Sequence, residues 1–299
     1  MRPVLRSAAG FTLVEAIIAI VITGIVAGIV AVFIARPVQG YADSVRRAEL
    51  TDAADVALRR MTRDIRLALP NSLRVTNGAT NFIEFIMTSS GGRYRDGGDG
   101  STCGNFLYTT NVDCGTGAAA ETAFDVLGAM PANPAIAVND FIVVYNLGPG
   151  YEPANAYRRG EAQCDATPTV PGCNIAQVSA VAGNLVTLDA NSFAVQSPPL
   201  PSSGSRFQVV PGDVRAVTYA CPAGAPGSLT RYWNYGFNAA QPTPPGAGSS
   251  ALLATNATCA IEYTTNATGR NGVLSVQLTL SADGESVTLF QQIHVDNAP

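Results

Sequence analysis

One acidic residue, Glu15, stands at the start of an apolar run that extends to Ala35. A run of about 20 apolar residues is long enough to cross the roughly 30 Å hydrocarbon core of a bilayer as a helix. An ionised carboxylate in such a segment is costly unless a group of opposite charge lies beside it, and residues of this kind generally serve a function. We therefore predict a membrane-spanning helix over about residues 13–35 whose carboxylate is neutralised by a partner.

The residues around Glu15 form the hexapeptide Gly10-Phe11-Thr12-Leu13-Val14-Glu15. Gly10 is the last residue of a basic leader, residues 1–10, and the residues that follow it lead into the apolar run. This arrangement resembles the cleavage and methylation site of type IV prepilins. The resemblance implies that a prepilin peptidase cuts between Gly10 and Phe11 and methylates the new amino group of Phe11. Glu15 would then be the fifth mature residue. In a filament it would neutralise the amine of a neighbouring subunit, so that neither charge lies alone in lipid.

Two other interpretations of the N-terminal segment are a plain membrane anchor with an incidental glutamate and a conventional cleaved signal peptide. The signal peptide is disfavoured because the apolar run is longer than usual and no small-x-small cleavage site follows it at Arg36-Pro37. Arg2 and Arg6 favour a cytoplasmic leader, since positive charges tend to remain on the cytoplasmic side.

A second helical pattern follows the apolar run. Apolar residues recur at steps of three and four over about residues 41–69, and charged residues occupy the other faces. The apolar stripe consists of Leu50, Ala54, Leu58, Met61, Ile65 and Ala68. We expect one helix over residues 11–69, which Pro37 can kink. Its upper stripe is expected to pack on the protein's own sheet, and the alternative is a partner helix in a coiled coil.

Beyond the helix, the sequence consists of short strand patterns bounded by turn residues. The clearest are two alternating runs at residues 274–280 and 287–295, separated by Asp283-Gly284, which predict an antiparallel hairpin. Two stretches, residues 89–117 and 223–256, are rich in turn-forming residues, and we interpret both as surface loops. The predicted fold class is α+β: a pilin-like long N-terminal helix packed on an antiparallel β-sheet domain with loop insertions.

Six cysteines lie beyond the membrane segment, and none forms a CxxC pair. An even number outside the anchor indicates disulfides in an oxidising compartment, so we expect residues 70–299 to form a periplasmic β-rich domain. Many pairings are possible, and we favour the sequential one because its first two pairs close loops with little apolar content. These pairs are Cys103–Cys114, Cys164–Cys173 and Cys221–Cys259. Free buried thiols are the alternative, and a metal site is disfavoured because no histidine lies near these cysteines.

Composition and the remaining motifs exclude several functions. The formal net charge of −4 becomes −6 without the two leader arginines. We therefore expect no nucleic-acid partner, which would need a basic surface. The only histidine, His294, lies in the last strand pattern, and no GxSxG motif is present. We predict that the chain is not an enzyme and holds no cofactor or metal, and we interpret the acidic, glycine-rich segment 96–100 as a flexible turn rather than a calcium site.

Residues 58–75, 217–221 and 229–231 resemble segments of minor pilins from the MSHA (mannose-sensitive haemagglutinin) type of pilus. The resemblance implies a minor pilin-like structural subunit, held in the inner membrane by one span until it is assembled into a pilus. Its partners would be the prepilin peptidase and other pilins, contacted through their N-terminal helices. The alternatives are a J-type pseudopilin of a type II secretion system and a membrane-anchored periplasmic adhesion or binding module.

Overall fold

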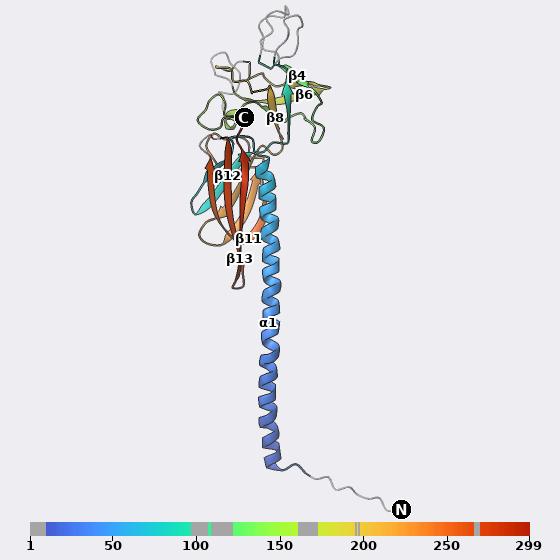
Figure 1. Ribbon diagram of the computed structural model, residues 1–299, viewed down its shortest axis with the longest axis vertical. Coiled ribbons are helices and arrows are strands. Elements are labelled where there is room, and N and C mark those ends of the chain that lie inside the picture. Colours follow the sequence, from blue (N-terminus) through green and yellow to red (C-terminus); the bar gives the residue numbers. More distant parts are fainter. Residues whose placement is uncertain are drawn as a thin grey trace, which may run out of the picture.

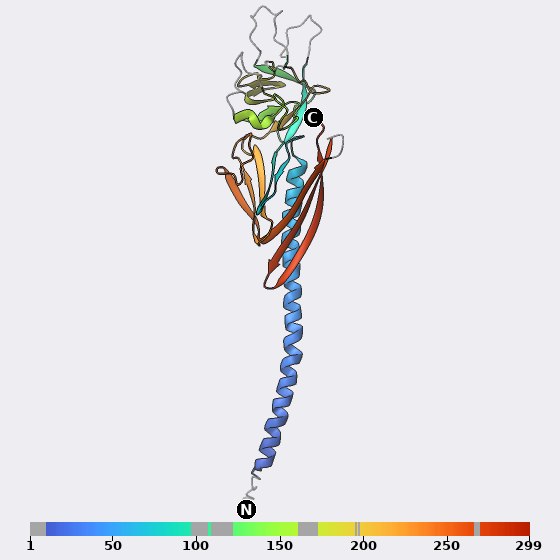
Figure 2. The ribbon, with the colours of Figure 1, turned by 90° about the vertical axis from the view of Figure 1, so that its left-hand side faces the viewer.

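The computed structural model describes residues 10–96, 107–108, 122–160, 173–194, 196, 198–265 and 270–299, except the side chains of Ala35 and Arg36. A single long helix extends away from a β-rich head, and the N-terminal end of the helix lies far from every strand (Figure 1). The head has two parts, a sheet that packs on the upper half of the helix and a barrel at the end farthest from the N-terminus (Figure 2).

The helix α1 spans Leu13–Arg66, slightly less than the predicted range at both ends. It begins at Leu13 because the Thr12 side chain caps it, accepting a hydrogen bond from the backbone N–H of Glu15. It ends where the backbone N–H of Leu67 turns back to the carbonyl groups of Asp64 and Ile65. The helix continues through Pro37, since the loss of one backbone hydrogen bond is compatible with a helix held by its neighbouring turns.

Seven antiparallel strands form the sheet that packs on α1. In order across the sheet they are β1 (Arg74–Thr76), β2 (Thr80–Ile86), β9 (Ala216–Pro222), β10 (Gly227–Trp233), β11 (Ser249–Thr265), β12 (Asn271–Ala282) and β13 (Glu285–Asp296). The predicted final hairpin is confirmed: β12 and β13 pair from Asn271 opposite Asp296 down to Ala282 opposite Glu285. Asp283 and Gly284 both adopt positive φ, which is the conformation that a tight hairpin turn requires.

Inward-facing residues of α1 and the sheet form one hydrophobic core, so the predicted stripe is confirmed and packs on the protein's own sheet. From the helix, Ala54, Ala57, Leu58, Met61 and Ile65 are buried, with Leu50 and Ala68 at the margins. Asp64 departs from the predicted pattern. The sequence pattern placed it with the charged residues on the outward faces of the helix, but in the structure it is only 2% exposed. Its carboxylate accepts hydrogen bonds from Tyr219 and Arg231 within this core.

A six-stranded closed barrel is inserted between β2 and β9, and of this segment the sequence analysis assigned only residues 89–117 to a surface loop. Its strands, in order around the barrel, are β3 (Ser90–Tyr94), β4 (Ala123–Leu127), β7 (Leu185–Leu188), β6 (Ile175–Ala182), β5 (Phe141–Val143) and β8 (Arg206–Val210). A short 3-10 helix, η1 (Ala156–Gly160), lies in the same insertion. The α+β class is thus confirmed, and the insertion adds a second β structure with a core of its own.

The two predicted surface loops are wrong in part. The first contains β3, and the second contains β10 and the beginning of β11. The loop prediction was wrong at β3 because the glycines there were interpreted as turn formers. A Cβ on Gly91 would lie 2.8 Å from the carbonyl oxygen of Phe207, and one on Gly92 would lie 2.7 Å from the Phe207 ring. These glycines therefore permit a close approach between β3 and β8 and do not mark a flexible segment.

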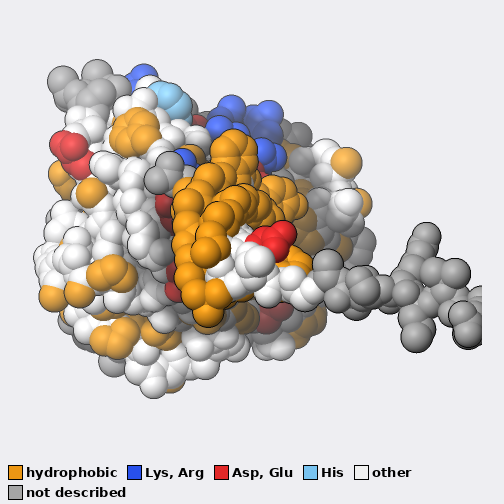
Figure 3. Space-filling view, turned by 90° about the horizontal axis from the view of Figure 1, so that it is seen from below, with side chains coloured by type: hydrophobic (Ala, Val, Ile, Leu, Met, Phe, Trp, Pro, Cys, Tyr) orange, Lys and Arg blue, Asp and Glu red, His pale blue; other side chains and the backbone are white. Residues whose placement is uncertain are grey.

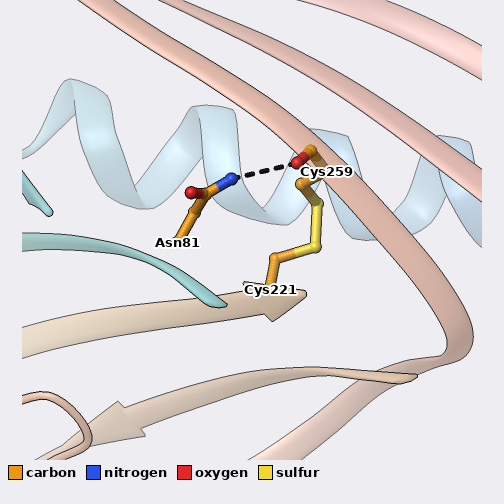
Figure 4. The surroundings of a disulfide bond; sticks show 3 residues. All are labelled: Asn81, Cys221 and Cys259. Atoms are coloured by element: carbon orange, nitrogen blue, oxygen red, sulfur yellow. Dashed lines mark hydrogen bonds between the residues drawn. A yellow bond between two sulfur atoms is a disulfide. The ribbon is translucent and has the colours of Figure 1, made fainter. Parts of the chain in front are cut away.

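A disulfide joins Cys221 of β9 to Cys259 of β11, the two strands on either side of β10 (Figure 4). The side-chain amide of Asn81 donates a hydrogen bond to the backbone carbonyl of Cys259 over 3.0 Å. This cross-link is one of the three expected pairs. Cys173 is also disulfide-bonded, while Cys103, Cys114 and Cys164 lie outside the described residues.

A buried carboxylate, Glu84 on β2, lies near the junction between the sheet and the barrel insertion. Its oxygens accept hydrogen bonds from Arg74 over 2.6 Å and from Tyr235 over 2.8 Å. The Arg74 guanidinium also lies 3.8 Å above the ring of Tyr157 in η1, whose hydroxyl donates to the Ser72 carbonyl. This network connects the sheet to the insertion through charged and aromatic groups that are shielded from solvent.

Burial raises the pKa of Glu84 above its ordinary value of 4.5, in spite of the opposing hydrogen bond and charge of Arg74. A carboxyl whose pKa is higher in the folded chain stabilises the fold most when it is protonated, and this contribution is lost as the pH rises through the folded pKa. We therefore expect the free energy of unfolding to fall less in Glu84→Gln than in the unaltered protein as the pH is raised from about 4 to about 7.

Urea unfolding of the detergent-solubilised chain, followed by the fluorescence of its single tryptophan, Trp233, would measure this difference. Glu262→Gln, at an exposed position of β11, controls for the change in overall charge. An identical pH dependence in the unaltered protein and in Glu84→Gln would contradict the raised pKa.

Candidate processing and assembly site

The predicted site residues lie together at the free end of α1. Gly10 and Phe11 precede the helix and are exposed, Phe11 to 77%. Glu15 occupies the third helical position, so its carboxylate lies at the positive end of the helix dipole, where a negative charge is favourable. The structure thus presents the Gly10–Phe11 bond in an accessible segment that precedes the helix, about one helical turn away from an exposed carboxylate.

Thr12 and Glu15 form a reciprocal pair that the sequence analysis did not single out. The backbone N–H of Glu15 donates to Thr12 Oγ1 over 3.3 Å, and the Thr12 hydroxyl approaches Glu15 Oε2 at 3.5 Å. The pattern of threonine followed three residues later by glutamate is the capping-box signature, and it could have been found in the sequence. Glu15 therefore also helps to fix where the helix begins.

The lower half of α1 is apolar on all sides and is not covered by the head. Every large aliphatic residue from Leu13 to Ile34 is exposed, and Glu15 is the only ionisable residue between Leu13 and Ala35. Viewed along the helix from its N-terminal end, hydrophobic side chains surround the axis, with acidic atoms beside them (Figure 3). By length and composition this is a helix able to cross a membrane, which is the expected span.

Two arginines connect the helix to the head above this apolar segment. Arg47 forms an ion pair with Glu285 at 2.6 Å, and Arg46 forms one with Asp283 at 3.4 Å. Both partners lie at the β12–β13 turn, which points down along α1 toward the N-terminus (Figure 1). The head therefore meets α1 from about Arg46 upward, and the exposed helix below it is longer than a bilayer requires.

The other residues considered for catalysis or metal binding do not form a site within the part of the chain that the structure describes. His294 lies on β13 and is exposed. Among the described residues, no group of three His, Cys, Asp or Glu side chains could hold a metal ion. The acidic segment 96–100 lies outside the described residues apart from Asp96.

Residues 5–31 match the family described as the prokaryotic N-terminal methylation motif. Neither a curated protein nor a solved structure matches the chain. The matched segment contains the whole hexapeptide from Gly10 to Glu15 and the first half of the exposed apolar helix. Residues 5–31 therefore carry the N-terminal methylation motif of type IV prepilin-like proteins, and this motif is joined to a hydrophobic N-terminal helix. This motif implies processing by a prepilin peptidase and membrane anchoring before assembly, and proteins of this class are typically structural rather than enzymatic.

Proposed function

We propose that this chain is a minor pilin-like structural subunit of an MSHA-type type IV pilus. It is cleaved between Gly10 and Phe11, N-methylated on Phe11, and assembled through its apolar helix with Glu15 as the charge that neutralises a neighbour's amine. The observation that carries the proposal is an apolar helix that stands free of its own head and bears a single carboxylate at its N-terminal end. Such a surface is stable only in lipid or against other apolar helices.

The location follows from the same features. Before assembly, the span lies in the inner membrane with residues 70–299 in the periplasm, where an oxidising environment accounts for the Cys221–Cys259 disulfide. The resemblance of residues 58–75 to the helix end of MshO supports the MSHA-type assignment. The inserted barrel supports a minor rather than a major subunit, because a bulky head is accommodated more easily at a filament end than along its shaft.

A second candidate function is favoured by the position of the barrel. It lies at the end of the head farthest from the membrane-spanning segment, where a membrane-anchored adhesion or binding module would present its surface (Figures 1 and 2).

The alternative to a pilus subunit, a J-type pseudopilin of a type II secretion system, would have the same processing and the same helix. Co-purification with pilus or with secretion components distinguishes these two assemblies.

Substitution of Glu15 tests the assembly role. Glu15→Gln keeps a capping-box side chain at the helix start but removes the charge, whereas Glu15→Ala removes both. We expect both variants to be processed normally and to be depleted at least about tenfold in sheared filaments, because the neighbour's ammonium would remain unpaired in an apolar environment. Immunoblots of sheared and membrane fractions measure the ratio.

Thr23→Ala provides the control, since it removes a polar but uncharged group from the same exposed helix. It is expected to be incorporated like the unaltered chain. Incorporation of Glu15→Gln at the unaltered level would show that the charge has no role in assembly.

A further inference from the structure

The strand β13 is one edge of the seven-stranded sheet, and half of its backbone groups point away from its only neighbouring strand. In an antiparallel ladder, successive residues alternate between bonding to the neighbour and pointing away from it. The backbone N–H of Asn297 donates to the carbonyl of Arg270, and the same register continues down the β12–β13 ladder. The odd-numbered residues of β13 therefore bond to β12. The N–H and C=O groups of its even-numbered residues, from Ser286 to Asp296, meet no other backbone group that the structure describes.

This edge lacks the features that usually prevent a further strand from pairing with it, which are proline, charge, a bulge or a covering loop. Residues 286–295 contain no proline, lysine, arginine or acid, and their pairing with β12 has no register shift. The opposite edge, β1, is only three residues long, and Arg74 on it donates to the backbone carbonyls of Asn238 and Ala239. The fold thus blocks the short edge and leaves the 12-residue edge able to accept a strand.

The open edge borders a cationic groove. The strand β13 packs beside α1 (Figure 1), and a shallow groove of about 430 Å³ lies between it and the last turns of the helix. The groove is lined by Arg59, Thr62, Arg63, Arg66, Leu67 and Gln291. All three arginines are exposed, and Arg66 has no ionic partner among the described residues. Because Gln291 is on the inward face of β13, a strand added at this edge would direct every second side chain toward the arginines.

We propose that the free edge of β13 binds an extended, acidic peptide segment of a partner protein, which adds a further strand antiparallel to β13. Every strand pair already in this sheet is antiparallel. Peptide residues opposite Thr288, Phe290 and Gln292 would exchange backbone hydrogen bonds with β13. Their side chains would lie on the outer face, beside the exposed ring of Phe290. The peptide residues between them would face the groove.

Carboxylates at alternate positions of the peptide fit the row of arginines. Arg59, Arg63 and Arg66 follow one another at about 6 Å and about 4.5 Å along the helix axis. Side chains on one face of a strand recur about every 7 Å, which long arginine side chains can match. The planar guanidinium group pairs closely with a carboxylate. A second copy of this chain does not supply this chemistry, because its residues 286–295 contain no acid and its arginines would repel this row.

Peptide binding to the full chain in detergent micelles tests the inference. The probe is fluoresceinyl-Glu-Val-Glu-Val-Glu-Val-Glu-amide, and fluorescence anisotropy measures its dissociation constant. We expect saturable binding, and at least about tenfold weaker binding of Glu-Glu-Glu-Val-Val-Val-Glu, which has the same composition without the alternation. Methylation of the valine backbone nitrogens should abolish binding, whereas methylation of the internal glutamate nitrogens should be tolerated. Only the valine N–H groups face β13 when the glutamates face the groove.

Variants of the chain locate the site. Phe290→Pro removes an N–H that points away from the sheet, a position where an edge strand accepts proline, and should abolish peptide binding. Arg66→Glu should weaken binding about tenfold by setting a carboxylate against the peptide. Arg93→Glu makes the same charge change at an exposed arginine of the barrel and should leave the affinity unaltered. Formation of the Cys221–Cys259 disulfide shows that each variant has folded.

Several results would overturn the inference. Equal affinity for the alternating and the blocked peptide, or equal losses on methylating valine and glutamate nitrogens, would exclude strand addition without reliance on any variant. Equal affinity in Arg66→Glu and Arg93→Glu would exclude the groove. Failure of the alternating peptide to bind, including the case in which the chain instead associates with itself through β13, would also contradict it. The site lies outside the membrane-spanning segment and the processing motif, so each of these results leaves the proposed function standing.

Discussion

Gly10→Val is expected to leave the chain at its full, unprocessed length in the membrane. A peptidase that cuts after a glycine must bring the backbone close to its reacting groups, and a branched side chain at that position prevents the approach. The fold itself would not respond, because a Cβ on Gly10 would meet no atom within 4 Å. Mass spectrometry of the purified chain should therefore show Met1 or its direct successor at the N-terminus, with no methylated Phe11.

Gly40→Val is the control for this substitution. A Cβ on Gly40 also meets nothing within 4 Å, and the residue lies in the exposed part of α1 beyond the motif. We expect this variant to be cut and methylated normally. Normal processing of Gly10→Val would mean that the family resemblance does not locate the cleaved bond.

Asp64→Asn is expected to lower the free energy of unfolding by about 3–5 kcal/mol, because it leaves the buried guanidinium of Arg231 without a counter-charge. Asp64 Oδ2 accepts two hydrogen bonds of 2.8 Å, from Arg231 Nε and from the Tyr219 hydroxyl. Burial, and next the negative charge of Asp64, raise the pKa of Tyr219 well above its ordinary value, so this hydroxyl remains a donor. Arg231 also lies 4.8 Å from the centre of the Trp233 ring, which makes tryptophan fluorescence a direct probe.

Two further variants identify the cause of the loss. Asp55→Asn removes a half-buried carboxylate from the same helix, where the solvent-accessible ion pair with Arg59 is worth about 0–1 kcal/mol. Replacing both partners, Asp64→Asn with Arg231→Met, removes the unpaired charge and is expected to cost less than Asp64→Asn alone. Equal losses in the single and double variants would indicate that packing, and not the charge, makes Asp64 important.

The features that local periodicity determines were predictable. The apolar run and the stripe from Leu50 to Ala68 gave the helix, since each residue repeats a spacing that only a helix satisfies. Alternation on both sides of Asp283-Gly284 gave the last hairpin. The Gly10–Glu15 motif gave the candidate site, because its residues are neighbours in the sequence and no tertiary contact is needed to bring them together.

The barrel and the buried charges were not predictable by the same reasoning. β5 is only three residues long, and it closes the barrel by pairing with β8, a strand distant in sequence. No local pattern encodes such a pairing. Asp64 was placed among the outward charges because it neighbours Arg63 and Arg66, yet it lies at the edge of the buried face and meets Arg231 only in the folded chain. A charged residue at such an edge is buried or exposed according to its tertiary partners.

The order of the strands has a consequence for biogenesis. The stripe of α1 is among the first parts of the chain to leave the ribosome, and β12 and β13, which pack against it, are among the last. Until that final hairpin is made, the half of the helix outside the bilayer lacks the two strands that contact it most. A chaperone with an apolar binding surface, or the membrane surface, would have to cover the apolar stripe of the helix during this time. A chain whose synthesis stops before β12 would be a preferred target for quality-control proteolysis.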